Sequence, residues 1–153
     1  MKVIFLDFDG VLNCEKYISR CGNSGINIDI TRLQLIKNLV EVTNAKIVLS
    51  SSWREHWEKE CHKCDAVGLE INNIFAEFGL TIYDKTPKLN ARREQEIEQY
   101  LDQNTDVENF VVFDDCYLSS NVINGHFIKT SYYKNGIEED DVLKAITIFK
   151  GEV

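Results

Sequence analysis

The sequence predicts a three-layer α/β fold with a mostly parallel central sheet and helices on both faces of that sheet. Three short apolar runs carry this prediction: VIFL (3–6), KIVL (46–49) and NFVVF (109–113). Unbroken apolar runs of this length are typical of strands that are covered on both faces. Helical patterns separate the runs, and strands that alternate with helices form right-handed crossovers and therefore parallel sheets. The expected architecture is Rossmann-like.

Weaker patterns predict the remaining elements. Apolar side chains recur at helical spacing over residues 31–43, 91–102 and 138–150, which predicts three amphipathic helices. The runs LTIY (80–83) and HFIK (126–129) are weaker candidates for strands. Together with the three strong runs, these segments alternate along the chain as strands and crossover helices.

Length and composition indicate one domain over residues 1–153. The chain is 44% hydrophobic and 27% charged, which is ordinary for a soluble globular protein, and its length is sufficient to bury a core. Its net charge of −8 argues against non-specific binding to nucleic acid or to anionic membranes. That charge does not exclude a local phosphate site.

The lack of a recognisable signal peptide and the cysteine usage indicate a cytoplasmic protein. The N-terminal apolar run is too short for a signal peptide and is interrupted by Asp7 and Asp9, and no segment approaches the length of a membrane span. Five cysteines, an odd number, indicate reduced thiols. Cys61 and Cys64 form a CxxC, but no second ligand pair follows at a spacing usual for zinc, so a zinc site is not favoured.

Acidic and hydroxyl side chains follow directly after the strong apolar runs. Asp7 and Asp9 come after the first run, Ser50 after the second, and Asp114 and Asp115 after the third. In parallel α/β sheets the functional crevice lies beyond the carboxyl ends of the strands, so these side chains should converge there. Four converging carboxylates repel one another unless a cation compensates them. Oxygen ligands of this kind suit Mg²⁺.

Four segments stand in a fixed order along the chain: FLDFDGVLN, KIVLSSSWR, the basic cluster in DKTPKLNARRE, and VVFDD. Their order resembles the four motifs of the haloacid-dehalogenase (HAD) superfamily of phosphotransferases, over residues 3 to about 115. DGVLN and SSSWR, followed by RREQEIEQYL, resemble more closely the HAD domain of some RNA-repair proteins. The resemblance implies a HAD-type phosphoric monoester hydrolase.

The resemblance implies a role for each acidic residue. Asp7 would be the nucleophile that forms an aspartyl-phosphate. Asp9 would protonate the leaving oxygen and then deprotonate the attacking water. Mg²⁺ would be the cofactor, held by the Asp7 carboxylate, the backbone carbonyl of Asp9, and the acidic pair Asp114 and Asp115.

The phosphoryl group would be bound by a hydroxyl and a cation. The resemblance assigns the hydroxyl to Ser50, whereas Ser52, three residues before Glu55, forms a capping box for a helix that starts near Trp53. The cation that binds the phosphoryl group would be Lys88 or Arg93. Lys85 and Arg92 lie near them in the sequence and are further candidates.

A second interpretation competes for these basic residues. A solvated helix face, with Arg92 paired to Glu96 four residues later, explains any one of them equally well. Some fixed cation is still required, because the charge of the phosphoryl group must be stabilised.

Two further segments lie near the motifs. Residues 14–27 are polar and contain glycine, which predicts a loop or small hairpin beside Asp9, either a flap or an ordinary surface loop. Trp53 and Trp57 could stack on a base, but aromatic residues four apart on a helix more often pack in the core.

The intervals between the motifs are too short for a sizeable cap domain. An open crevice favours a large substrate, so a phosphorylated nucleic-acid end is the first expectation, with Arg54, Arg92 and Arg93 as candidate contacts. No membrane and no obligate protein partner are implied. The alternatives are a small-molecule or nucleotide phosphatase, a phospho-accepting receiver domain with Asp84 after its third strand, and an inactive binding module.

Overall fold

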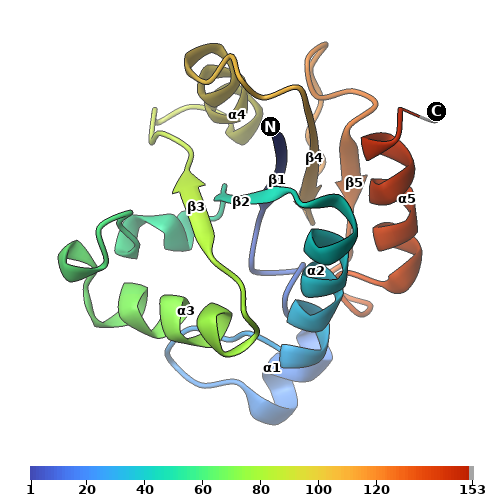
Figure 1. Ribbon diagram of the computed structural model, residues 1–153. Coiled ribbons are helices and arrows are strands. Elements are labelled where there is room, and N and C mark those ends of the chain that lie inside the picture. The colour runs from blue at the N-terminus through green and yellow to red at the C-terminus, as the bar shows by residue number, and fades with distance from the viewer. Residues whose placement is uncertain (152–153) are drawn as a thin grey trace.

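The computed structural model describes residues 1–151 and contains a five-stranded sheet in the order β3-β2-β1-β4-β5 (Figure 1). All four pairs of neighbouring strands are parallel. The strands are β1 (Lys2–Leu6), β2 (Lys46–Leu49), β3 (Ile82–Lys85), β4 (Asn109–Asp114) and β5 (Phe127–Lys129). The predicted α/β fold is confirmed, and the two weak strand predictions hold with small shifts of their bounds.

Helices connect the strands in the predicted alternation. They are α1 (Glu15–Cys21), α2 (Ile30–Thr43), α3 (Ala66–Glu77), α4 (Arg93–Gln103) and α5 (Glu139–Phe149), with short 3-10 helices η1 (Ser52–His56) and η2 (Cys61–Lys63). The three helices predicted from apolar stripes correspond to α2, α4 and α5. Asp29 is the N-cap of α2, and its side chain accepts a hydrogen bond from the amide of Thr31.

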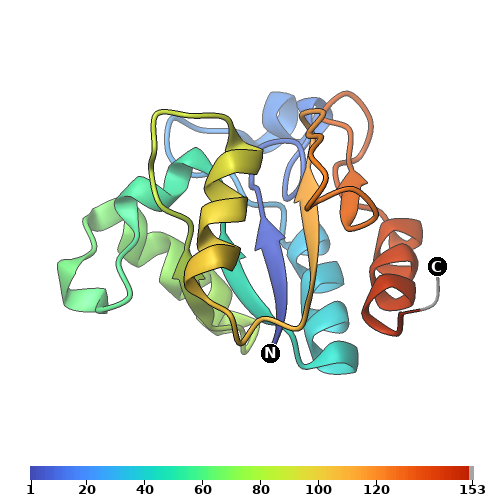
Figure 2. The same ribbon diagram turned by 90° about the horizontal axis from the view of Figure 1, so that it is seen from above.

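Side chains of β1 alternate between the two faces of the sheet, and each face has its own core. Ile4 and Leu6 belong to the core formed with α2, α3 and α5. Val3 and Phe5 belong to the core formed with α4, where the Phe5 ring meets Tyr100 edge-on at a centroid distance of 5.6 Å. Figure 2 shows α4 on the opposite side of the sheet from α2 and α5. Burial on both faces explains why β1 is continuously apolar.

Two local predictions need correction. The segment 14–27 contains the helix α1 and is not a hairpin. The turn at Trp53 is a 3-10 helix, and its N-cap is Ser51, whose Oγ accepts a hydrogen bond from the amide of Trp53. This bond spans only two residues and closes a tight turn, so the capping box predicted for Ser52 does not form.

The interval between β2 and β3 folds against the sheet instead of forming a cap domain. Ile71 and Phe75 of α3 are buried in the main core, and Gly68 lies so close to η1 that an added Cβ would stand 1.9 Å from the carbonyl oxygen of His56. Within residues 1–151 the fold is therefore a small α/β domain without a large cap. None of its helices is long and apolar enough to cross a membrane.

Candidate active site

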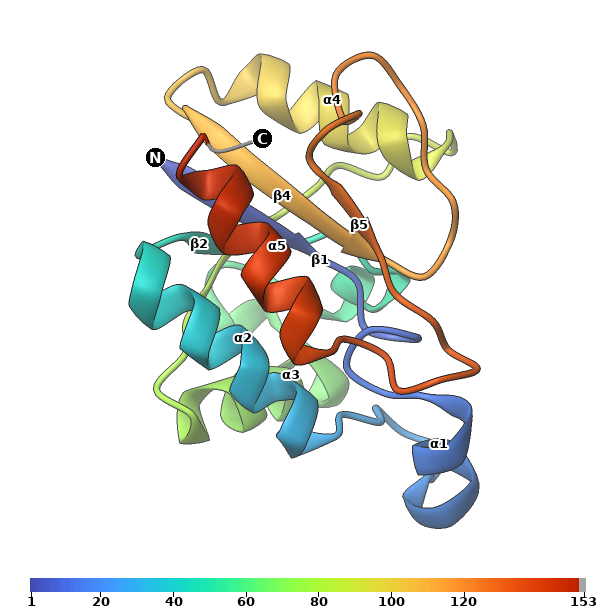
Figure 3. The same ribbon diagram turned by 90° about the vertical axis from the view of Figure 1, so that its right-hand side faces the viewer.

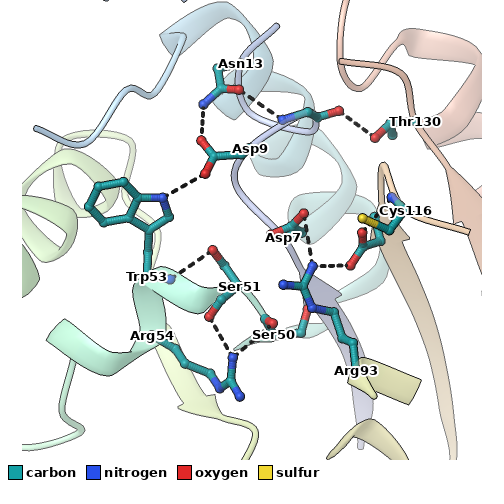
Figure 4. Close-up of polar contacts among 12 residues, drawn as sticks. Asp7, Asp9, Asn13, Ser50, Ser51, Trp53, Arg54, Arg93, Cys116 and Thr130 are labelled. Atoms are coloured by element: carbon teal, nitrogen blue, oxygen red, sulfur yellow. Dashed lines mark hydrogen bonds and ion pairs between the residues drawn. The ribbon is translucent and has the colours of Figure 1, made fainter. Parts of the chain in front are cut away.

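The ends of three neighbouring strands bring the predicted site residues together. The amide of Asp7 donates to the carbonyl of Phe113 in β4 at 3.2 Å, and the amide of Ser50 donates to the carbonyl of Leu6 in β1 at 3.1 Å. Asp7, Ser50 and Asp114 thus leave the sheet side by side, at its carboxyl edge. Figure 4 shows Asp7 and Ser50 on either side of the Arg93 guanidinium.

Arg93 links two of the buried carboxylates. It is the first residue of α4, and its Nη1 lies 3.2 Å from Oδ2 of Asp7 and 2.6 Å from Oδ2 of Asp114. No other hydrogen bond of its guanidinium is formed within residues 1–151, so Nε and Nη2 keep their donors free for a ligand. Arginine presents such donors in a planar fork that matches a phosphoryl group.

One arginine does not neutralise this site. The pKa of Asp7 is raised from 3.8 to about 7, first by burial and next by the Asp114 carboxylate, while Arg93 opposes the rise. Burial also raises the pKa of Asp114, again against the opposing effect of Arg93. Burial would lower the pKa of Arg93, but the two carboxylates hold it above its ordinary value. The arrangement favours further positive charge beside Asp7 and Asp114.

The Asp9 carboxylate turns away from Arg93 (Figure 4). Its Oδ1 accepts a hydrogen bond of 2.9 Å from Nδ2 of Asn13, and its Oδ2 accepts one of 3.0 Å from Nε1 of Trp53. Asn13 is itself fixed, because its Oδ1 accepts from the amide of Gly10 and its Nδ2 also donates to the carbonyl of Asn27. Asn13 and Trp53 therefore position Asp9, a function that the sequence did not predict.

Gly10 allows the acidic pair to approach the loop of Asp9. Its φ is +81°, and a Cβ at this position would stand 2.3 Å from Oδ2 of Asp115. The Thr130 hydroxyl fixes the same turn by donating to the carbonyl of Gly10 at 2.6 Å. The glycine of the DxDG motif is needed both for its left-handed backbone and for this close contact.

The carboxylates at this edge suit a hard divalent cation. Ligand atoms of Asp114, Asp115 and Cys116 lie within 4.8 Å of one another, and Asp7 reaches Asp114 through the shared Arg93 contact. Carboxylate oxygens are the ligands that Mg²⁺ prefers, whereas a thiol such as that of Cys116 suits softer metals. Asp9 would contribute its backbone carbonyl, since its carboxylate is held by Asn13 and Trp53.

Ser50 presents an unsatisfied hydroxyl at the same edge. The residue is fully buried, and its Oγ is the one buried side-chain polar atom of the described chain that lacks a hydrogen-bond partner. Leaving such a group unpaired costs about 1–3 kcal/mol, and buried hydroxyls are nearly always paired. An orphan hydroxyl beside Asp7 is the arrangement expected for a ligand-binding group.

Among the basic candidates, only Arg93 is placed with the carboxylates. Lys88 is exposed and pairs with Glu55 at 2.6 Å, while Arg92 is exposed and lies 3.9 Å from Glu94. Lys85 donates to the backbone carbonyls of Arg54 and Trp57. The phosphate-binding assignment of Lys88 is therefore not supported by its position.

Arg54 holds the loop that follows β2 and is not a surface contact. It is buried, and its Nη2 forms an ion pair of 2.9 Å with Oε2 of Glu96 in α4. Its Nη1 donates to the carbonyls of Ser50 and Ser51. The expectation that Arg54 contacts nucleic acid is wrong, because its buried guanidinium is bound to Glu96 and to the carbonyls of this loop. Glu96 pairs with Arg54 and not with Arg92.

The remaining cysteine and tryptophan candidates lie apart from these carboxylates. Trp57 is buried and donates to Oδ1 of Asn72 at 2.8 Å, as expected for a core residue. Cys64 accepts a hydrogen bond from the amide of Glu58, and Cys61 is exposed. Within residues 1–151, the only hydrogen bonds of Cys64 through its side chain are with Glu58.

A parallel sheet with a DxD after β1, a hydroxyl after β2 and an acidic pair at the end of β4 defines the class of HAD-type domains. The family described as "HAD domain in Swiss Army Knife RNA repair proteins" matches residues 3–142, and the chain belongs to this family. The family suggests a HAD-type hydrolase. No curated protein and no solved structure gave a significant match.

Proposed function

We propose that this domain is a Mg²⁺-dependent phosphatase that hydrolyses phosphomonoesters through an aspartyl-phosphate on Asp7. The observation that carries the proposal is the buried, unpartnered hydroxyl of Ser50 beside Asp7 and the Arg93 guanidinium. A hydroxyl and a guanidinium are donors, and a phosphoryl group offers several acceptor oxygens between them. The free donors thus point to an anionic ligand next to a carboxylate nucleophile.

In the first step, a carboxylate oxygen of Asp7 attacks phosphorus, and the bond from phosphorus to the leaving oxygen breaks. Asp9 supplies the proton that the leaving oxygen takes up. Arg93 and Ser50 hold the non-bridging oxygens during the transfer. The phosphoryl group is then covalently attached to Asp7, and the dephosphorylated product leaves with its new hydroxyl group.

In the second step, water attacks the phosphorus of the aspartyl-phosphate. Asp9, now ionised, accepts the proton of that water, and the bond to Asp7 breaks to release inorganic phosphate. Asp7, Asp114, Asp115 and the carbonyl of Asp9 would hold Mg²⁺, which when bound would neutralise charge as two anions approach each other. Asn13 and Trp53 keep Asp9 at the open side of the site, where the leaving group departs.

We further propose a phosphorylated nucleic-acid end as the substrate. Without a large cap domain, the site cannot enclose a small substrate within the chain itself, whereas a large substrate can be bound through remote contacts. The family description, which refers to RNA-repair proteins, agrees with this choice. The net charge of −8 requires that recognition be local, through a few cationic residues.

The receiver-domain alternative has little support. Asp84, its candidate acceptor, lies within β3, and its Oδ2 accepts a hydrogen bond of 3.0 Å from the hydroxyl of Tyr100 in α4. The carboxylate is thus directed under α4 and away from Asp7. Stable phosphorylation of Asp84 by a small phosphodonor, without turnover, would revive the alternative.

The test is phosphate release, in the presence of Mg²⁺, from a panel of substrates. The panel contains 5′- and 3′-phosphorylated oligonucleotides, the matching mononucleotides, phosphopeptides and sugar phosphates. We expect a higher kcat/KM for a phosphorylated oligonucleotide than for the matching mononucleotide. Equal values, or a preference for a sugar phosphate, would contradict the substrate assignment while leaving the phosphatase activity standing.

A further inference from the structure

A pocket of ≈ 240 Å³ lies beyond the carboxyl edge of the sheet, between α1, the start of α2 and Asn135. Three cationic side chains line it, those of Lys16, Arg20 and Arg32, against a single carboxylate, that of Asp29. The chain has a net charge of −8, so the local charge of this pocket is opposite in sign to that of the whole chain. We call it the basic pocket.

The protein offsets only part of the positive charge of the basic pocket, because Asp29 is the one carboxylate beside three cations. Neither Lys16 nor Arg20 forms an ion pair with any residue between 1 and 151. Arg32 donates through Nη1 to the carbonyl of Ile137 at 2.7 Å, a neutral partner that orients the guanidinium without cancelling its charge. Asp29 is occupied as the N-cap of α2, where its Oδ1 accepts from both the amide and the hydroxyl of Thr31.

Helix α1 has a basic face and little packing to stabilise it. The helix has seven residues and none of them is buried, and such short helices are marginal without packing. Lys16 and Arg20 are four residues apart, so their like charges meet on one face and destabilise the helix. An anion in the basic pocket would turn this repulsion into two favourable contacts.

The basic pocket adjoins the loop that carries the catalytic aspartates. Cys14, which lines it, follows Asp9 by five residues, so their Cα atoms lie at most about 18 Å apart. The amide of Glu15 donates to the carbonyl of Tyr132 at 2.8 Å, which joins α1 to the turn that contains Asn135. Figure 3 shows α1 and this turn together beyond the end of β1. A substrate a few nucleotides long could reach from Asp7 to the pocket.

We propose that the basic pocket binds a second, non-reacting phosphate of the substrate, namely an internucleotide phosphodiester of a strand whose terminal phosphate lies at Asp7. Guanidinium and ammonium groups bind phosphate oxygens through charge-assisted hydrogen bonds. The inference rests on the proposed function and deepens it. It assigns to the basic pocket the local cationic contact that an acidic protein needs to bind a polyanion.

Binding without turnover tests the pocket directly. In the Asp7→Asn background, the affinity for a fluorescent 5′-phosphorylated tetranucleotide, and for its 3′-phosphorylated counterpart, is measured for Lys16→Gln/Arg20→Gln. The control is Lys2→Gln/Lys46→Gln, which removes the same charge at the amino ends of β1 and β2. We expect the pocket pair to weaken the binding of at least one probe about tenfold and the control pair about twofold or less.

The salt dependence of the same affinities gives a second readout. Losing one neutralised phosphate should make the slope of log K against log salt shallower by about 0.7 for the pocket pair alone. Equal weakening by the two pairs would show a general charge effect and would overturn the inference. So would tetranucleotide binding that neither pair changes.

Turnover measurements distinguish two possible ligands of the pocket, an internucleotide phosphodiester and the second phosphate of a nucleoside bisphosphate. We expect Lys16→Gln/Arg20→Gln to lower kcat/KM for a phosphorylated tetranucleotide about tenfold relative to that for p-nitrophenyl phosphate. If a nucleoside bisphosphate shows this dependence and the tetranucleotide does not, the phosphodiester assignment is wrong. If no phosphomonoester is hydrolysed, the proposed function fails, whereas the binding measurement still decides the role of the pocket.

Discussion

Trp53 donates a hydrogen bond of 3.0 Å from Nε1 to Oδ2 of Asp9, across 44 positions of sequence. It fixes the carboxylate that we propose as general acid, and Asn13 holds the other oxygen of the same group. Because these donors act through Asp9, Trp53 and Asn13 are positioning residues in the proposed mechanism.

Replacing Trp53 with phenylalanine should reduce catalysis more than stability. Trp53→Phe keeps an aromatic ring but removes the donor to Asp9, so we expect kcat to fall about tenfold for an alkyl phosphate. The loss should be smaller for p-nitrophenyl phosphate, whose leaving group needs little protonation. Trp57→Phe is the control, because Trp57 is buried and donates to Asn72, so this variant should lower the melting temperature instead. Equal losses for the two substrates would remove Trp53 from a role in acid catalysis.

Substitutions of the three serines after β2 should affect activity and stability differently. Ser50→Ala deletes a hydroxyl that has no partner, so the free energy of unfolding should fall by no more than about 1 kcal/mol, while kcat/KM falls about a hundredfold. Ser51→Ala removes the cap of η1 and should lower the free energy of unfolding by about 1 kcal/mol. Ser52→Ala, at an exposed position, serves as the control. A large loss of stability without loss of activity in Ser50→Ala would contradict our assignment.

The buried pair of Arg54 and Glu96 should be a major determinant of stability. Their side chains are 7% and 8% exposed, and Nη2 lies 2.9 Å from Oε2. Glu96→Gln leaves a buried guanidinium without its counter-charge, so we expect the free energy of unfolding to fall by about 3–5 kcal/mol in denaturant titrations. The matched surface change is Glu55→Gln, which breaks the exposed pair with Lys88 and should cost less than about 1 kcal/mol. Similar losses in the two variants would contradict the buried role of Arg54.

Removal of divalent ions should abolish turnover, and Mg²⁺ should restore it best. Ca²⁺ should inhibit, because it fits oxygen ligands but prefers more of them in a looser geometry. Asp114→Ala and Asp115→Ala should each raise the Mg²⁺ concentration needed, and at least one should be inactive. Mg²⁺ should also raise the melting temperature of the wild-type domain. Asp140→Ala, which changes an exposed residue of α5, is the control, and full activity after exhaustive chelation would contradict this part of the account.

Elements with a strong periodic pattern could be predicted from the sequence, and α1 shows why others could not. Residues 3–6 and 47–49 are apolar because they are buried in the sheet, so their sequence reflects their position. Helix α1 buries none of its residues, so it has no apolar stripe to indicate a helix. The sequence of this segment therefore predicts a loop or hairpin.

The candidate site was predictable where a motif and a strand end coincide, as at Asp7 and Asp114. It was not predictable where a role depends on a distant partner. Arg54 looks like a free cation in the sequence SSSWR, and only folding places Glu96 against it. The hydrogen bond from Trp53 to Asp9 could not be inferred from the sequence either, because Asp9 follows β1 and Trp53 follows β2.

The most direct test of the central claim compares inorganic phosphate release by the wild-type domain and by Asp7→Asn, with Mg²⁺ and a phosphorylated oligonucleotide. The amide is a poor nucleophile of similar shape, and the Asp7 carboxylate is buried with a pKa raised to about 7, so Asp7→Asn should fold with an undiminished melting temperature. We predict turnover by the wild-type domain and none above background by Asp7→Asn. Retention of substantial activity by Asp7→Asn, with the fold intact, would contradict the assignment of Asp7 as the nucleophile.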